Sequence, residues 1–231
     1  MACKAAVCQR SPMSAPLEIL FQDEWLVAVN KPAGQLVHPA DVPQEGDEVT
    51  MKILRDQLGQ LVHNIHRIDR PTTGVLLFAL NKGVSRAMNR AFERHQVQKT
   101  YWAVIEGNPP TEAWENHEAL QKSEDEPFRE AHTDFRVLKA IRHEPCLSLI
   151  EATPHSGRYH QIRRHLAQAG LPIVGDFRYG GIERGERLGA LLGINSRMLL
   201  QAKKLEFSHP KTGLQTTIEA STAPEIEKVC R

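Results

Sequence analysis

Short, almost unbroken runs of apolar residues divide this chain, and turn-forming residues separate them. Such runs predict buried strands. The predicted strands cover residues 17–21, 25–29, 75–80, 97–106, 135–138, 147–152, 198–207 and 214–218. Gln22-Asp23-Glu24 between the first two runs and the turn-rich stretch 209–213 between the last two each predict a hairpin.

Apolar residues at helical spacing predict helices at three further places. These helices cover residues 50–61, 82–95 and 160–169. Asn81 is a favourable cap for the second helix, and Gly170 is a typical stop for the third. Strands outnumber helices, and short turns join most neighbouring strands. The pattern therefore predicts an α+β fold, with helices packed around a mixed, mainly antiparallel sheet.

Length and composition are those of a soluble globular enzyme, with 231 residues, 41% of them hydrophobic and 25% charged. No apolar run approaches the roughly 18 residues that span a bilayer, and the N-terminus lacks the apolar stretch of a secretory signal. The four cysteines have no metal-type spacing, which favours a reducing cytoplasm. We expect a disordered tail over 1–16, one catalytic domain over 17–231, and no membrane association.

Charge is distributed unevenly, although the net charge is only +1. Residues 111–130 hold seven acids and two bases, whereas 155–187 hold six arginines and three histidines against three acids. An arginine-rich surface suits a phosphate backbone. We therefore expect Arg158, Arg178 and Arg184 to contact RNA phosphates, and the acidic segment to be a polar surface excursion that faces away from the RNA.

Residues 66–74, His-Arg-Ile-Asp-Arg-Pro-Thr-Thr-Gly, are the most informative stretch of the sequence. Asp69 lies between two arginines, and fixed positive charge nearby keeps a carboxylate ionised and positioned. That suits a nucleophile or an electrostatic catalyst better than a general acid. The alternative is a turn whose Arg and Asp side chains only cap the strand that follows.

Three ordered stretches resemble motifs of the RluA family of pseudouridine synthases, over about residues 17–218. The first comprises residues 30–34 and 37–38, the second residues 66–74, and the third residues 157–166, 172–176 and 179–180. In the second motif, Ile68 stands where Leu is usual. The resemblance implies the pseudouridine synthase fold, with an active cleft across the middle of the sheet. Because the first motif begins at Asn30, we expect no S4 RNA-binding domain of the kind that larger relatives carry.

The implied reaction breaks the C1′–N1 bond of a uridine, rotates the uracil and joins C1′ to C5. It conserves atoms and exchanges no electrons with the surroundings, so we expect no cofactor. The spacings of His63 and His66, and of His155, His160 and His165, fit no tetrahedral metal site, and we predict none.

By the same resemblance, Asp69 is the essential carboxylate, with three possible roles: attack on the sugar, addition to the base, or assistance to elimination. Arg163 would be its cationic partner, with Arg164 as the rival for that place. Tyr101 would stack on the uracil and help to move the C5 proton. Ile162 would form an apolar wall of the uracil pocket.

Four further residues are predicted to bind RNA. Arg67 would fill the place of the flipped base, because a planar guanidinium can stack there. His66 would contact a phosphate. Arg158 and Arg164 belong to the arginine-rich surface.

The opening residues 17–32 are most similar to the TruC branch of the family, whose substrate is uridine 65 of tRNA. We therefore expect tRNA as the partner of a monomeric enzyme, with an rRNA target as the alternative. A catalytically silent RNA-binding module is a second alternative. A glycosidase is a third, but it usually needs two carboxylates. The only other candidate acid, Asp176, has the sequence context of a structural turn.

Overall fold

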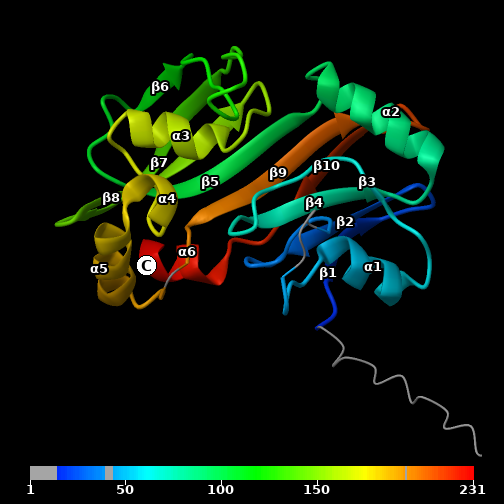
Figure 1. The fold of residues 1–231 in the computed structure, drawn as a ribbon, viewed down its shortest axis with the longest axis horizontal. Helices are drawn as coiled ribbons and strands as arrows, with labels where there is room; N and C mark the ends of the chain where they lie inside the picture. The colour runs from blue at the N-terminus through cyan, green and yellow to red at the C-terminus, as the bar shows by residue number, and fades with distance from the viewer. Residues whose placement is uncertain (1–14, 40–43, 196) are drawn as a thin grey trace, which may run out of the picture.

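The computed structural model describes residues 15–39, 44–195 and 197–231. The expected N-terminal tail lies almost wholly outside these residues. Ten strands form one sheet, in the order β1-β2-β4-β9-β5-β8-β7-β6, with β10 on β9 and β3 on β4 (Figure 1). The strands are β1 Glu18–Gln22, β2 Leu26–Lys31, β3 His63–Asn64, β4 Thr73–Ala79, β5 Gln98–Glu106, β6 Ala113–Asn116, β7 Thr133–His143, β8 Cys146–Pro154, β9 Leu200–Ser208 and β10 Gln215–Glu219.

Helices cover both faces of this sheet. They are α1 Thr50–Leu58, α2 Lys82–Glu93, α3 Gln161–Gln168, α4 Phe177–Gly180, α5 Ile182–Leu192 and α6 Pro224–Cys230. On the β1-β2-β4 half, α2 packs on one face and α1 on the other. On the β5-β8 half, α3 packs on one face, and α5 and α6 pack on the other (Figure 1). The strand interiors are therefore buried on both sides, which explains their unbroken apolar runs.

The predicted α+β architecture is confirmed, including both hairpins and the three predicted helices. The structure adds β3, β6, α4, α5 and α6, which the sequence pattern did not indicate. The segment 111–130 is mostly exposed, as expected for a surface excursion, and it contains the edge strand β6, which pairs with β7. Among the described residues, no helix is both long enough and apolar enough to cross a membrane.

The two halves of the sheet meet at β9. This strand pairs with β5 in antiparallel fashion and with the start of β4 in parallel, where Gly74 lies beside Ala202. Gly74 has φ +104°, and a Cβ there would lie 2.1 Å from the carbonyl oxygen of Ala202. The close approach needs glycine, and it comes five residues after Asp69.

Gly74→Ala should therefore destabilise the protein by about 3 kcal/mol or more, because backbone strain and a clash with β9 act together. Gly213→Ala is the matched control. Gly213 also has a positive φ, +72°, but no atom lies within 4 Å of its Cβ position. The Gly213→Ala substitution should lower the free energy of unfolding by only ~1 kcal/mol. Urea denaturation of both variants measures the difference, and equal losses would refute the role of the close approach.

Candidate active site

Most of the predicted site residues line one cleft of about 720 Å³. They come from the loop before β4, from β5, and from the segment between β8 and the first turn of α3. The predicted residues that line it are His66, Arg67, Asp69, Tyr101, Arg158, Ile162 and Arg163. Chain segments almost a hundred residues apart in sequence are thus brought to one cavity.

The loop that carries Asp69 is held from behind by Lys31 at the end of β2. The Lys31 side chain is fully buried, and its Nζ donates to the carbonyls of Pro32, Gln35 and Arg70 at 2.7–3.1 Å. Burial, with the nearby charge of Arg197, lowers the pKa of Lys31 to about 7. Gly34 N also donates to the Arg70 carbonyl at 2.8 Å. Residues 30–34 therefore support the loop that carries Asp69, a role that the sequence did not indicate.

Arg163 joins two carboxylates. Its Nε and NH2 donate to the two oxygens of Asp176 at 2.7 and 2.8 Å, and its NH1 donates to Asp69 Oδ2 at 3.1 Å. Arg163 and Asp176 are buried, whereas 21% of the Asp69 side chain is exposed in the cleft. The expected pairing of Asp69 with Arg163 is present. Asp176 has the structural role that its sequence context indicated, because it also caps α4.

His160 is a neighbour of Asp69 that sequence reasoning did not select for the site. Its Nε2 lies 3.6 Å from Asp69 Oδ2, and its Nδ1 lies 2.9 Å from the hydroxyl of Tyr179. Burial lowers the pKa of His160 to about 4, so the ring is neutral at pH 7. Asp69 therefore has one fixed cation, Arg163, and one neutral imidazole beside it.

Tyr101, Ile162 and Leu200 also line the cleft. These side chains offer an apolar surface with one hydroxyl. Burial, with the charge of Asp69, raises the pKa of Tyr101, so the hydroxyl keeps its proton at neutral pH. Lys99 lies at the rim, where its Nζ donates to the carbonyl of Ser156 at 2.8 Å. Burial lowers the pKa of Lys99 to about 8.

Comparison with known proteins identifies the family. A family model described as RNA pseudouridylate synthase matches residues 25–168, more than half of the chain. The chain belongs to this family. It is 41% identical over 219 residues to a tRNA pseudouridine synthase C of Pasteurella multocida, covering 87% of this chain and 90% of the relative. It is 42% identical to one of Haemophilus influenzae, with coverages of 88% and 92%.

Solved structures show the same fold. Human RNA Pseudouridylate Synthase Domain Containing 1 superposes with a TM-score of 0.73 at 24% identity, over 92% of this chain and 86% of that one. Human RNA Pseudouridylate Synthase Domain Containing 4 gives the same TM-score and identity, over 92% and 91%. As a member of the pseudouridine synthase family, the protein is an isomerase.

Several residues of this pseudouridine synthase make internal contacts that differ from the expected ones. Arg184 bonds Glu106 beside a separate small cavity and is not among the residues that line the cleft, so its RNA contact stays a prediction. Arg164 NH1 donates to the carbonyl of Gln121 at 2.6 Å. Lys122 lines the cleft, so the acidic segment 111–130 does not lie wholly away from it.

Other predicted RNA-binding residues remain at the cleft or close to it. Arg158 Nε donates to the carbonyl of Glu130 at 2.9 Å, which orients its side chain at the rim. Arg178 NH1 donates to the Tyr159 hydroxyl at 3.1 Å, and its guanidinium lies over the Tyr159 ring. Arg67 is exposed and lines the cleft.

His66 supports the Asp69 loop from within. Its Nε2 accepts a hydrogen bond from the backbone N of Leu77 at 3.0 Å, and its ring stacks on Phe92. Burial, with the charge of Lys99, lowers the pKa of His66 to about 3. A neutral imidazole makes no ion pair with a phosphate. Because Nε2 already accepts a hydrogen bond from Leu77, only Nδ1 of His66 is available for the predicted RNA contact.

Arg163→Ala should destabilise the pseudouridine synthase by about 3–5 kcal/mol, because it leaves the buried carboxylate of Asp176 without its cation. Arg164→Ala, one residue along α3, removes a single hydrogen bond and should cost ~1 kcal/mol. Chemical denaturation of the two variants provides the comparison. A loss for Arg163→Ala no larger than that for Arg164→Ala would contradict the buried pairing.

His66 should contribute to acid sensitivity. As pH falls from 6.5 towards 3, the unfolded chain protonates this imidazole while the folded chain does not, so unfolding becomes more favourable. His66→Gln keeps an acceptor for Leu77 N but removes the titration. The free energy of unfolding should therefore fall less between pH 7.5 and 5 in the variant than in the wild type. An identical fall in both proteins would show that His66 titrates normally.

Proposed function

We propose that this pseudouridine synthase acts on tRNA in the cytoplasm, and that its target is the uridine at position 65. The observation that carries the tRNA assignment is the identity of 41–42% to enzymes named tRNA pseudouridine synthase C, over most of both chains. The position rests on the resemblance of residues 17–32 to that branch. An rRNA uridine is the second candidate, because the same family also contains rRNA enzymes.

In the proposed mechanism, Asp69 supplies the reacting carboxylate. The 3.1 Å hydrogen bond from Arg163 fixes its position in the cleft. The neutral imidazole of His160 adds no competing charge. The carboxylate would approach the bound uridine from one side in each of its three possible roles: attack on C1′, addition to the base or assistance to elimination.

The apolar side chains that line the cleft would hold the uracil. Tyr101 offers a ring face for stacking, and Ile162 and Leu200 extend the apolar surface. Because its pKa is raised, the Tyr101 hydroxyl is protonated. It would act as a relay that receives the C5 proton while it donates its own to water, and N1 of the uracil takes up a proton from water in turn, so that the net transfer is from C5 to N1. Arg67, exposed at the cleft, would occupy the space that the flipped base leaves, offsetting an unstacking cost of a few kcal/mol.

Asp69→Asn should lower pseudouridine formation at least a thousandfold while tRNA binding stays close to that of the wild type, because many phosphate contacts supply the affinity. Asp56→Asn, an exposed change on α1, is the matched control and should keep wild-type turnover. Single-turnover assays and filter binding measure the two properties. Turnover of Asp69→Asn above a thousandth of wild type would remove Asp69 from its proposed role.

The substrate is tested separately with bulk tRNA and rRNA from cells that lack the enzyme. Pseudouridine should form at position 65 of tRNA after incubation with the protein. Modification of rRNA alone would establish the second candidate. Binding without modification of either RNA would favour the silent RNA-binding module.

A further inference from the structure

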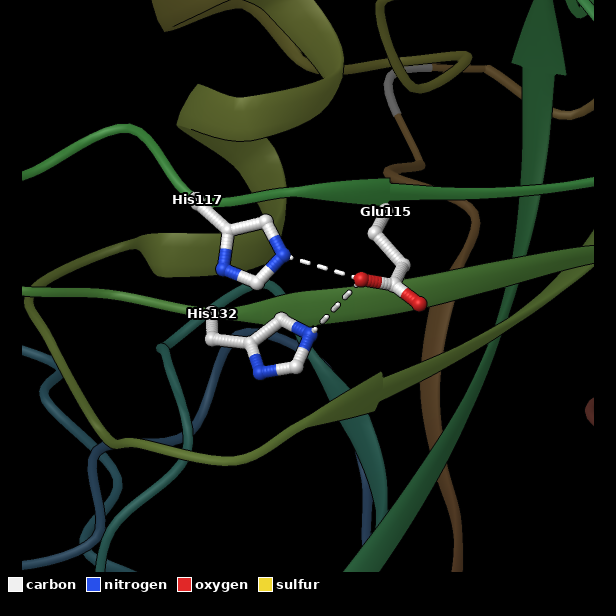
Figure 2. A group of neighbouring side chains, drawn as sticks. All are labelled: Glu115, His117 and His132. Carbon is white, nitrogen blue, oxygen red and sulfur yellow. Dashed lines mark hydrogen bonds and ion pairs between the residues drawn. The ribbon is translucent and has the colours of Figure 1, made fainter.

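Three histidines and two carboxylates gather at the β6 edge of the sheet, outside the residues that line the cleft. Glu115 lies in β6, His117 just after it, and His132 just before β7. Figure 2 shows both imidazoles directed at the carboxylate of Glu115. The Oε2 atom of Glu115 lies 2.9 Å from His117 Nε2 and 3.7 Å from His132 Nε2.

These separations suit a tetrahedral metal ion. Ligand atoms about 2.05 Å from a zinc ion in tetrahedral geometry lie about 3.3 Å from one another. The two distances to Glu115 Oε2 fall on either side of that value, and the three ligand atoms all lie within 4.8 Å of each other. Two imidazole nitrogens and one carboxylate oxygen are a donor set that zinc prefers.

The histidines are stacked and offer their nitrogens to one side. The His117 and His132 rings lie 4.0 Å apart with an interplanar angle of 22°. The Nε2 atom of His132 is shielded from solvent and makes no hydrogen bond of acceptable geometry. A lone pair at this atom is therefore available to an ion, while Glu115 and His117, each 62% exposed, leave the site accessible from solution.

Charge at this edge also favours a cation. Glu115 and Asp134 are direct cross-strand partners in the β6–β7 pair, and like charges in that position are destabilising. Asp134 lies 2.7 Å from both His132 Nε2 and His155 Nε2. The contact with His155 is a hydrogen bond, whereas the contact with His132 lacks hydrogen-bond geometry. Both distances are shorter than a tetrahedral edge, so Asp134 is not counted among the ligands of the ion.

We propose that Glu115, His117 and His132 form a site for a divalent transition-metal ion of the zinc class, with water completing the coordination. The site stands apart from the proposed chemistry and supports the fold. The backbone carbonyl of His132 accepts hydrogen bonds from His155 N and Gln161 Nε2, both at 2.9 Å. An ion there would tie the segment after β6 to β7 and thus to the first turn of α3, which carries Arg163.

The test is calorimetric titration of metal-free full-length protein with zinc chloride. Wild type should bind an ion that raises its melting temperature, and His117→Ala and His132→Ala should each weaken binding at least tenfold and remove the thermal shift. His38→Ala, which removes an exposed histidine in a different part of the fold, is the matched control and should bind as wild type does.

Cobalt(II) substitution separates this site from binding by cysteines. The expected spectrum has intense tetrahedral d–d bands, without a thiolate charge-transfer band, and it is lost in His117→Ala. His155→Ala should retain the ion. Unchanged zinc affinity in His117→Ala, or loss in His155→Ala alone, would overturn the assignment of these three ligands.

Discussion

The site depends on a single buried guanidinium. Arg163 and Asp176 are both buried, and two nearly parallel hydrogen bonds join them. Removing two charges from water is costly, and bidentate geometry offsets much of that cost. Because Asp176 also accepts from the backbone of α4, the arginine cannot rotate without disturbing that helix. Its Nη1 group is therefore held in one place, where it donates a hydrogen bond to Asp69.

Most of the sheet and three helices could be predicted because their apolar patterns are strong. The missing elements have weaker patterns for identifiable reasons. β6 is a four-residue edge strand with only one large apolar side chain, Trp114. α5 contains Gly185 and Gly189, which lower helix propensity. The fold requires them, because a Cβ would lie 2.7 Å from Phe177 and 2.3 Å from the Asn195 carbonyl, respectively.

The residues of the candidate site also differ in whether the sequence could predict them. Asp69 and Arg163 lie in motifs that the sequence displays directly, Tyr101 lies on a predicted strand, and the structure brings all three to one cleft. His160 and Lys31 acquire their significance only through tertiary contacts: a ring turned towards Asp69, and an ammonium group buried under three carbonyls. The histidine cluster on β6 and β7 likewise depends on strand register, so no spacing along the chain could reveal it.

The order of the strands has a consequence for biosynthesis. β9, which joins the Asp69 half of the sheet to the Arg163 half, begins at residue 200 of 231. Domains fold as units while the chain leaves the ribosome, N-terminal parts first. Until β9 emerges, β4 and β5 have no strand between them to pair with. The nascent polypeptide can therefore complete the cleft only after β9 has been made, and a chain terminated before β9 would expose apolar strand edges.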